Sequence, residues 1–205
     1  MKTQRKFFPK AYGLKTQEDI NNLYDDWAET YDIEVKENGY VSPTRTALAL
    51  KSVLPLEALI YDVGCGTGLS GVALKEIGFS NIHGSEINPN MLKKAQQTGV
   101  YQSLRLGDIT NPFPDRVGLY DAIVAVGVIG AGAAPARLMR EALNALLPGG
   151  LLAFSLNDAA MAQQSCQDEL KFILNSGSAI ELFSEYGPHL SLIDVGSTIY
   201  ILKKV

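Results

Sequence analysis

Short apolar runs alternate with segments of helical periodicity along the chain from residue 59 onward. Apolar runs of about four to eight residues are typical of buried strands, and apolar positions three or four residues apart are typical of amphipathic helices. The pattern predicts strands over residues 59–63, 81–86, 102–107, 121–127 and 151–156, with helices over 67–77, 89–97, 135–147 and 161–175. Strands and helices in this alternation indicate a parallel sheet with helices on both faces. We therefore expect an open α/β fold.

The end of the chain breaks this alternation. Two strand-like segments, AIELFSEY at 179–186 and STIYILKKV at 197–205, are separated by a segment that contains Gly187 and Pro188. Glycine and proline together favour a loop, so we expect an antiparallel hairpin that closes a seven-stranded sheet. His189 falls in this expected loop, and the sequence shows no partner for it.

Two helices are expected before the first strand. The residues TQED at 16–19 match a capping box, and apolar positions at helical spacing follow them as far as Tyr31. A second helix is expected to begin at Ser42 and Pro43, and to end before Pro55. We expect these two helices to act as a lid.

The stretch DVGCGTG at 62–68 follows the first expected strand and holds three glycines. Glycine lets the chain turn sharply and brings bare backbone close to a ligand. The dinucleotide fingerprint GxGxxG would need a glycine at the position that Leu69 occupies. No Gly-Lys-Ser or Gly-Lys-Thr follows, so the stretch is not a P-loop. The loop indicates a nucleotide-like cofactor and argues against a dinucleotide.

Several motifs lie in register with this loop: Glu86 in HGSEINPNML, Asp108 in RLGDI, and LLPGGLLAFS at the turn into the fifth strand. Together with DVGCGTG they resemble the class I methyltransferases that use S-adenosylmethionine. The resemblance implies a Rossmann-like, doubly wound and mostly parallel sheet. Within that superfamily YDDWAETYD, Gly39-Tyr40 and Pro43 look like a branch of small methyltransferase-like proteins related to the Williams–Beuren-region methyltransferase.

The resemblance implies a site built from carboxylates, because the cofactor carries a ribose diol, an adenine, a sulfonium and an amino-acid end but no phosphate. Glu86 lies 22 residues after Gly64, a distance at which an acidic side chain accepts hydrogen bonds from ribose hydroxyls. Asp108 would reach the adenine amino group, although an acid after a strand also commonly caps the next element. Ile87 and Ile109 would line the faces of the ring.

The other expected cofactor contacts lie on the loop and on the strand beside it. Asp62 would sit behind the loop and help to hold the amino-acid end of the cofactor, while Val126 would border the transferred methyl group. The loop residues expected to bind the cofactor are Gly64, Cys65, Gly66 and Gly68. We expect Glu86→Ala to weaken cofactor binding severely with little effect on the melting temperature of the empty protein.

Aromatic residues before the first strand are candidates for the lid. Tyr24, Trp27 and Tyr31 share one helical stripe, which either packs in a core or faces a ligand. In the second case Tyr31 would close over the sulfonium, because a ring face attracts a cation. Tyr40 could take the same part from the next turn.

Composition limits the partners. The 205 residues, 46% of them hydrophobic, suit one domain over 1–205, with a tail and lid helices over 1–57 and an α/β core over 58–205. A formal net charge of -4 makes a nucleic-acid partner unlikely and favours a small-molecule substrate. The two cysteines show no metal-site spacing, and no apolar run of membrane-spanning length occurs. We expect a cytoplasmic protein without a metal, and no feature indicates its oligomeric state.

Three functions remain open at this level. The leading hypothesis is methyl transfer from S-adenosylmethionine to an O, N or S nucleophile of a small molecule. No general base is identifiable, and the Asn/Asp-Pro-Pro-Tyr/Phe segment of amino-group methyltransferases is missing after the fourth strand, where VGVIGAGAAPA suggests an apolar cavity. The second hypothesis is a non-catalytic sensor or partner-binding protein that binds S-adenosylmethionine. The third, a nicotinamide-dependent oxidoreductase, is disfavoured by Leu69.

Overall fold

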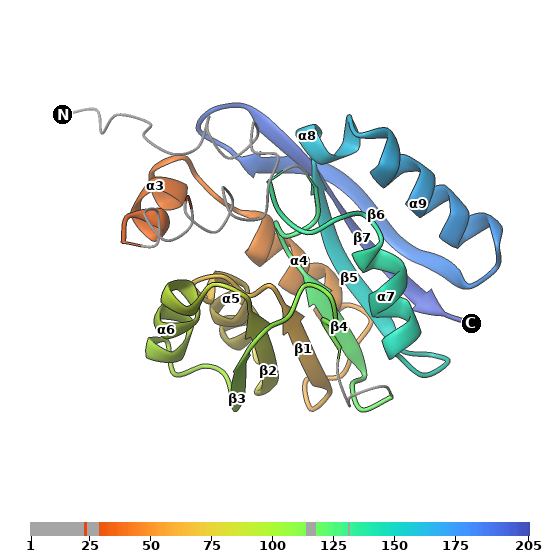
Figure 1. The fold of residues 1–205 in the computed structure, drawn as a ribbon, viewed down its shortest axis with the longest axis horizontal. Helices are drawn as coiled ribbons and strands as arrows, with labels where there is room; N and C mark the ends of the chain where they lie inside the picture. Colours follow the sequence, from red (N-terminus) through yellow and green to blue (C-terminus); the bar gives the residue numbers. More distant parts are fainter. Residues whose placement is uncertain (1–22, 24–28, 114–117, 131) are drawn as a thin grey trace.

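The computed structural model describes residue 23 and residues 29–113, 118–130 and 132–205. Within these residues seven strands form one sheet, and the first five strands in space run parallel. In spatial order they are β3 (Ser103–Leu106), β2 (Asn81–Glu86), β1 (Leu59–Val63), β4 (Ala122–Ala125), β5 (Leu151–Asn157), β7 (Val195–Lys204) and β6 (Ala179–Leu190) (Figure 1). Strand β7 runs antiparallel to both of its neighbours. The predicted Rossmann-like sheet with a closing hairpin is confirmed.

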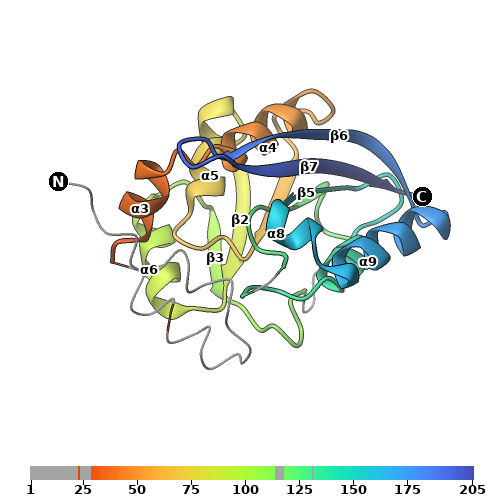
Figure 2. The ribbon, with the colours of Figure 1, turned by 90° about the horizontal axis from the view of Figure 1, so that it is seen from above.

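Helices cover both faces of the sheet (Figure 2). They are α3 (Tyr31–Glu37), α4 (Ser42–Lys51), α5 (Leu69–Ile77), α6 (Pro89–Gln97), α7 (Leu138–Ala145), α8 (Asp158–Met161) and α9 (Gln164–Asn175). One hydrophobic core lies between the sheet and helices α4 and α5, and a second lies between the sheet and helices α7 and α9. Burial on both faces explains why the parallel strands read as continuous apolar runs in the sequence.

Helix α4 is a structural layer of the sheet. Ala47 and Leu50 are buried against α5 and the central strands, and only Pro43 in the first turn reaches the pocket described below. The expectation that this helix forms part of a lid is therefore corrected, because its apolar face packs on the sheet. The stripe expected to run continuously to Tyr31 is also interrupted: a turn at 29–30 precedes α3.

Strand β6 is longer than the sequence suggested. The loop expected at Gly187 and Pro188 is wrong, because both residues pair with β7, opposite Ser197 and Gly196. Proline is tolerated there because β6 is the edge of the sheet, where a missing N–H need not break a ladder. His189 consequently lies in a strand. The helix expected over 161–175 is in fact α9, and the shorter α8 before it is capped by Asn157, which accepts a hydrogen bond from the Ala160 N–H.

Candidate functional site

A pocket opens at the carboxyl ends of the parallel strands. Strand β1 has β2 on one side and β4 on the other, so the chain reverses its direction across the sheet at this point. Open α/β sheets bind ligands at such a switch point. The empty space of the pocket, its open mouth included, is about 1150 Å³. Its wall combines the glycine loop, the ends of β2 and β4, the segment after β3, and the helices α3 and α7.

The three glycines of the loop have positive φ angles, and each serves a different purpose. A Cβ atom at Gly64 would clash with Val128, so this glycine allows the loop to pack against the segment after β4. A Cβ at Gly66 would meet nothing within 4 Å, because this residue faces the open pocket with a φ of 57°. A Cβ at Gly68 would lie 3.2 Å from the Ala95 Cα, so Gly68 permits the packing of α6 and does not line the pocket.

Glu86 is fixed at the edge of the pocket by the backbone around it. Its Oε2 accepts a hydrogen bond of 2.9 Å from the Gly66 N–H, and its Oε1 accepts one of 2.8 Å from the Asn88 N–H. Only 8% of the residue is exposed, and this burial raises the pKa of the carboxyl group although the two N–H donors oppose the shift. Each oxygen keeps a further lone pair for a ligand in the pocket that Glu86 lines.

These contacts correct the expectation for Glu86→Ala. The substitution would leave the Gly66 and Asn88 N–H groups without their acceptor. An unsatisfied buried donor costs about 1–3 kcal/mol. The empty protein should therefore melt at a lower temperature as well.

Asp62 lies behind the loop and outside the lining of the pocket, with its side chain fully buried. Its Oδ2 accepts hydrogen bonds from the Ser70 hydroxyl at 2.5 Å and from the Tyr101 hydroxyl at 2.7 Å. Its Oδ1 has no partner among the described residues. Burial raises the pKa of Asp62 to about 6, and the nearby charge of Glu86 adds to the rise. Asp62 therefore secures the first turn of α5 instead of touching the pocket.

Asp108 lies at the exposed rim of the pocket. Its Oδ1 accepts hydrogen bonds of 2.7 Å from both the N–H and the hydroxyl of Thr110, and these bonds lower the pKa of the carboxyl group. Asp108 therefore both caps the backbone at Thr110 and lies at the pocket. Ile87 and Ile109 line the pocket beside Asp108, and Ile87 is 37% exposed.

Two of the four candidate lid aromatics line the pocket. Tyr31 comes from the start of α3 and Tyr40 from the segment between α3 and α4. A Cβ atom at Gly127 would lie 2.6 Å from the Tyr40 hydroxyl oxygen, so the missing side chain makes room for this tyrosine at the end of β4. Tyr24 and Trp27 lie outside the described residues.

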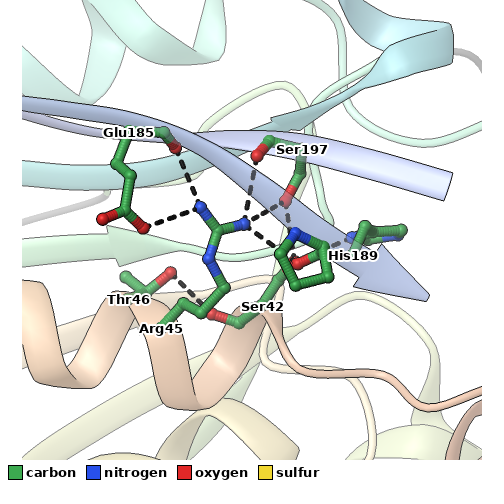
Figure 3. Close-up of polar contacts among 7 residues, drawn as sticks. Ser42, Arg45, Thr46, Glu185, His189 and Ser197 are labelled. Carbon is green, nitrogen blue, oxygen red and sulfur yellow. Dashed lines mark hydrogen bonds and ion pairs between the residues drawn. The ribbon is translucent and has the colours of Figure 1, made fainter. Parts of the chain in front are cut away.

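A polar cluster behind Tyr40 joins α4 to the hairpin (Figure 3). Arg45 Nη1 donates to Ser197 Oγ at 3.2 Å, Ser197 Oγ lies 3.0 Å from Ser42 Oγ, and Ser42 Oγ lies 2.8 Å from His189 Nδ1. The guanidinium can only donate, so Ser197 Oγ accepts from it and donates to Ser42 Oγ. The Ser42 hydroxyl then donates to Nδ1 of His189, which is the acceptor at the end of this chain. Burial lowers the pKa of His189 to about 4, in keeping with a neutral imidazole. The Tyr40 ring stands edge-on to it, with 5.0 Å between the centroids.

The sequence missed several residues of the pocket wall. The described part of VGVIGAGAAPA does form an apolar wall, as expected, but α7 contributes Leu138 and Glu141, for which no local motif exists. The charged side chains among the described lining residues are Glu86, Asp108 and Glu141, all of them acidic. The wall therefore repels anions and attracts cations.

Cys65 lines the pocket, but it is 5% exposed and burial raises the pKa of its thiol, which keeps it protonated. In the described ranges no group of three His, Cys, Asp or Glu side chains could hold a metal ion. Across the same ranges, no helix has the length and apolar character needed to cross a membrane.

Comparison with known proteins identifies the class to which this geometry belongs. Residues 61–154 match the family described as a methyltransferase domain. In a solved complex of the Haloferax volcanii Trm112 methyltransferase activator with a methyltransferase, one chain superposes with a TM-score of 0.67. The match has 16% identity and covers 90% of this chain and 97% of that one, which shows a shared fold. The chain carries a class I S-adenosylmethionine-dependent methyltransferase domain. S-adenosylmethionine is the methyl donor of this class, as expected.

Two curated relatives of this methyltransferase domain differ in their names and in the extent of their similarity. Human methyltransferase-like protein 27 is 37% identical over 146 residues, which is 69% of this chain and 59% of that protein. The 18S rRNA (guanine(1575)-N(7))-methyltransferase of Saccharomyces cerevisiae is 35% identical over 86 residues, 42% of this chain and 31% of that protein. The chain thus spans less than two thirds of the length of either relative.

Proposed function

We propose that the protein transfers a methyl group from S-adenosylmethionine to an O, N or S nucleophile of a small molecule. The observation that carries the proposal is the placement of Glu86 at the switch point, where the backbone fixes its carboxylate at the edge of the pocket. A carboxylate held in this way accepts hydrogen bonds from the two ribose hydroxyls and loses little conformational entropy on binding. A non-catalytic sensor is not favoured, because the relatives named above are methyltransferases or methyltransferase-like.

Each remaining part of the pocket has a counterpart on the cofactor. The rim carboxylate of Asp108 suits the adenine amino group, and Ile87 and Ile109 offer apolar surfaces for the ring. The uncovered backbone at Gly66 allows close approach of the ligand. Asp62 supports this part from behind, through Ser70 and Tyr101.

The end of the pocket at β4 is the candidate site for the methyl acceptor. When bound, S-adenosylmethionine supplies an electrophilic methyl group on a sulfonium cation. Val126 and Val128 offer an apolar surface there, and the Tyr40 hydroxyl lies beside Gly127. Alignment of two reactants contributes about 7–11 kcal/mol to such a reaction. The wall therefore acts by orienting the acceptor and excluding water, and a neutral amine or an anionic nucleophile needs no general base.

A small-molecule acceptor is supported by charge. Proteins that bind nucleic acids neutralise phosphates with Lys and Arg. The charged side chains in the described lining of this pocket are all acidic, and the whole chain has a net charge of -4. The similarity to an rRNA methyltransferase covers 42% of the chain, so RNA is the alternative acceptor that the experiment has to test. We also place the chain in the branch related to the Williams–Beuren-region methyltransferase, a placement that its similarity to methyltransferase-like protein 27 supports.

Calorimetric titration with S-adenosylmethionine, S-adenosylhomocysteine and NAD tests the cofactor site. We expect the first two to bind and NAD to leave no signal. Glu86→Gln keeps one acceptor oxygen but loses the charge, and should weaken binding about 10- to 100-fold, as loss of a charged hydrogen-bond acceptor implies. Glu76→Gln, on the exposed side of α5, is the matched control and should bind normally. Unchanged affinity of Glu86→Gln would remove Glu86 from the site.

Transfer of a labelled methyl group tests the acceptor. The protein is incubated with labelled S-adenosylmethionine and either a pool of small amines, phenols and thiols or purified rRNA. Label in the small-molecule pool supports the proposal. Label in rRNA alone, at a rate above that of a Glu86→Ala control, would assign the protein to RNA instead.

A further inference from the structure

A side-chain hydrogen bond joins helix α3 to the glycine loop. The Thr67 hydroxyl donates a hydrogen bond of 2.5 Å to Asp32 Oδ1. Thr67 belongs to DVGCGTG, is 3% exposed and lines the pocket, whereas Asp32 lies in the first turn of α3 and does not line it. A hydrogen bond to a carboxylate is about twice as strong as one between neutral groups. Asp32 is therefore placed to act on the pocket only through its neighbours.

The other end of α3 is also held. After the helix, Tyr40 forms a bridge with Leu190 at the end of β6, and the Val41 N–H donates to the carbonyl of His189. Before the helix, Lys94 Nζ of α6 donates to the Glu29 carbonyl at 3.3 Å. The helix thus spans the side of the pocket between the sheet edge and the glycine loop. At the loop end, the bond from Thr67 to Asp32 and the exposed Lys94 contact both help to hold it.

Tyr31 is the residue that this attachment would position. It precedes Asp32 in the first turn of α3, and its side chain lines the pocket that Thr67 also lines. Because adjacent residues share one short segment of backbone, fixing Asp32 fixes the direction from which the Tyr31 ring enters the pocket. An aromatic ring attracts a cation only when the cation lies over its face within about 6 Å of its centre. A small displacement of α3 would remove that interaction.

We propose that the hydrogen bond between Thr67 and Asp32 positions Tyr31 over the sulfonium, so that the protein holds S-adenosylmethionine in preference to S-adenosylhomocysteine. The proposal rests on the proposed function, because it concerns the same cofactor site. Asp32 and Thr67 are positioning residues here, and Tyr31 is the residue that touches the cofactor. The preference arises because S-adenosylmethionine carries a sulfonium cation and S-adenosylhomocysteine carries a neutral thioether.

Comparing the affinities for S-adenosylmethionine and S-adenosylhomocysteine distinguishes positioning of Tyr31 from a merely structural role of the hydrogen bond. Loss of the attachment removes a cation interaction that only S-adenosylmethionine makes, so its affinity should fall about 3- to 30-fold while that of S-adenosylhomocysteine changes less than about twofold. Mere loosening of the loop would weaken both ligands by the same factor. The ratio of the two dissociation constants is therefore the readout.

Four variants are titrated with both ligands. Thr67→Val removes the donor and leaves the charge of Asp32 in place, while Asp32→Ala removes the acceptor. Asp32→Asn keeps an acceptor oxygen and should retain most of the preference. Glu37→Gln removes the same charge from an exposed position of α3 and should match the wild type.

Tyr31→Leu completes the test as a double-mutant cycle with Thr67→Val. We expect the two effects on S-adenosylmethionine binding to be non-additive, because both remove the same interaction. Equal weakening of both ligands in Thr67→Val, or additive effects with Tyr31→Leu, would overturn the proposal. If the wild type binds neither ligand, the proposed function itself is wrong. If the wild type binds both ligands and the variants leave the ratio of the two dissociation constants unchanged, only the positioning role of Thr67 and Asp32 is wrong.

Discussion

Two buried carboxylates, Asp62 and Glu86, lie beside the same glycine loop but accept hydrogen bonds from different donors. Glu86 receives two backbone N–H donors and faces the pocket. Asp62 receives two hydroxyl donors through one oxygen, and its other oxygen is buried without a partner among the described residues. A buried charge costs free energy unless hydrogen bonds or opposite charges compensate it. Asp62 therefore carries the larger cost of the two when ionised.

The stability of Asp62→Asn should show this cost. The pKa of Asp62 is about 6 in the folded protein and 3.8 as the reference value for the unfolded chain. The folded state therefore binds the proton more tightly, so the carboxyl group destabilises the protein as pH rises from about 3.8 to 6, and fully above 6. At pH 7.5 the Asn variant should be more stable by up to about 3 kcal/mol. Thermal unfolding of the empty protein between pH 5 and 8 measures it, and equal pH slopes in wild type and variant would contradict it.

Site residues can be predicted from the sequence where a local motif carries the information. Gly64, Gly66 and Glu86 follow directly from a strand end and its loop, and all three line the pocket. The motif also predicts cofactor binding at Gly68, but Gly68 packs against α6, and this contact with Ala95 depends on how two helices meet. Residues such as Glu141 were missed for the same reason. No spacing in the chain indicates that α7 faces the glycine loop.

Among the elements, the junction between α4 and β6 explains why the hairpin is longer than expected. Arg45 donates to the carbonyls of Glu185 and Pro188, so the backbone beside Gly187 is satisfied without a loop. A Cβ atom at Gly187 would lie 2.8 Å from Arg45 Nη2. The glycine that suggested a loop thus admits the arginine side chain. By contrast β1, β2 and α6 begin and end where predicted, because their boundaries depend on local apolar runs and caps.

Acidification should weaken this junction through His189. Its pKa falls to about 4 in the folded protein from a reference of 6.5, because burial and the charge of Arg45 outweigh the attraction of Asp158. The unfolded chain binds a proton below about 6.5 and the folded protein does not, so stability is lost as pH falls from about 6.5 towards 4. The loss is up to about 3 kcal/mol.

His189→Gln should remove this dependence, since Gln does not titrate and its amide oxygen can accept from Ser42. The comparison is made in the Asp62→Asn background, because Asp62 titrates over the same range with the opposite sign. Melting temperatures at pH 7.5 and 5 are measured with and without His189→Gln. A decline of the same size in both proteins would mean that another group is responsible.

On the scale of the whole molecule, the site exists only after the sheet has assembled. The pocket wall takes residues from Tyr31 at the start of α3 to Glu141 in α7, more than a hundred positions apart, and the antiparallel hairpin lies on the other side of β5. The sequence predicts the order of the elements and the loop, but the acidic character of the described wall comes from three side chains on three separate segments. The distribution of charge around the ligand is thus a property of the fold.

The position of the pocket, away from the edge strand β6, predicts where a ligand will slow amide hydrogen exchange. S-adenosylhomocysteine at 100 times its dissociation constant stabilises the folded state by about 2.7 kcal/mol, which slows globally exchanging amides throughout the protein. Amides that exchange by local opening respond only where the ligand binds. We expect added local protection in residues 63–68, at Asn88 and in α3, and none in residues 180–187 of the edge strand β6. Exchange measured by mass spectrometry with and without the ligand tests this. If β6 gains local protection and residues 63–68 gain none, the site at the carboxyl ends of the strands is refuted.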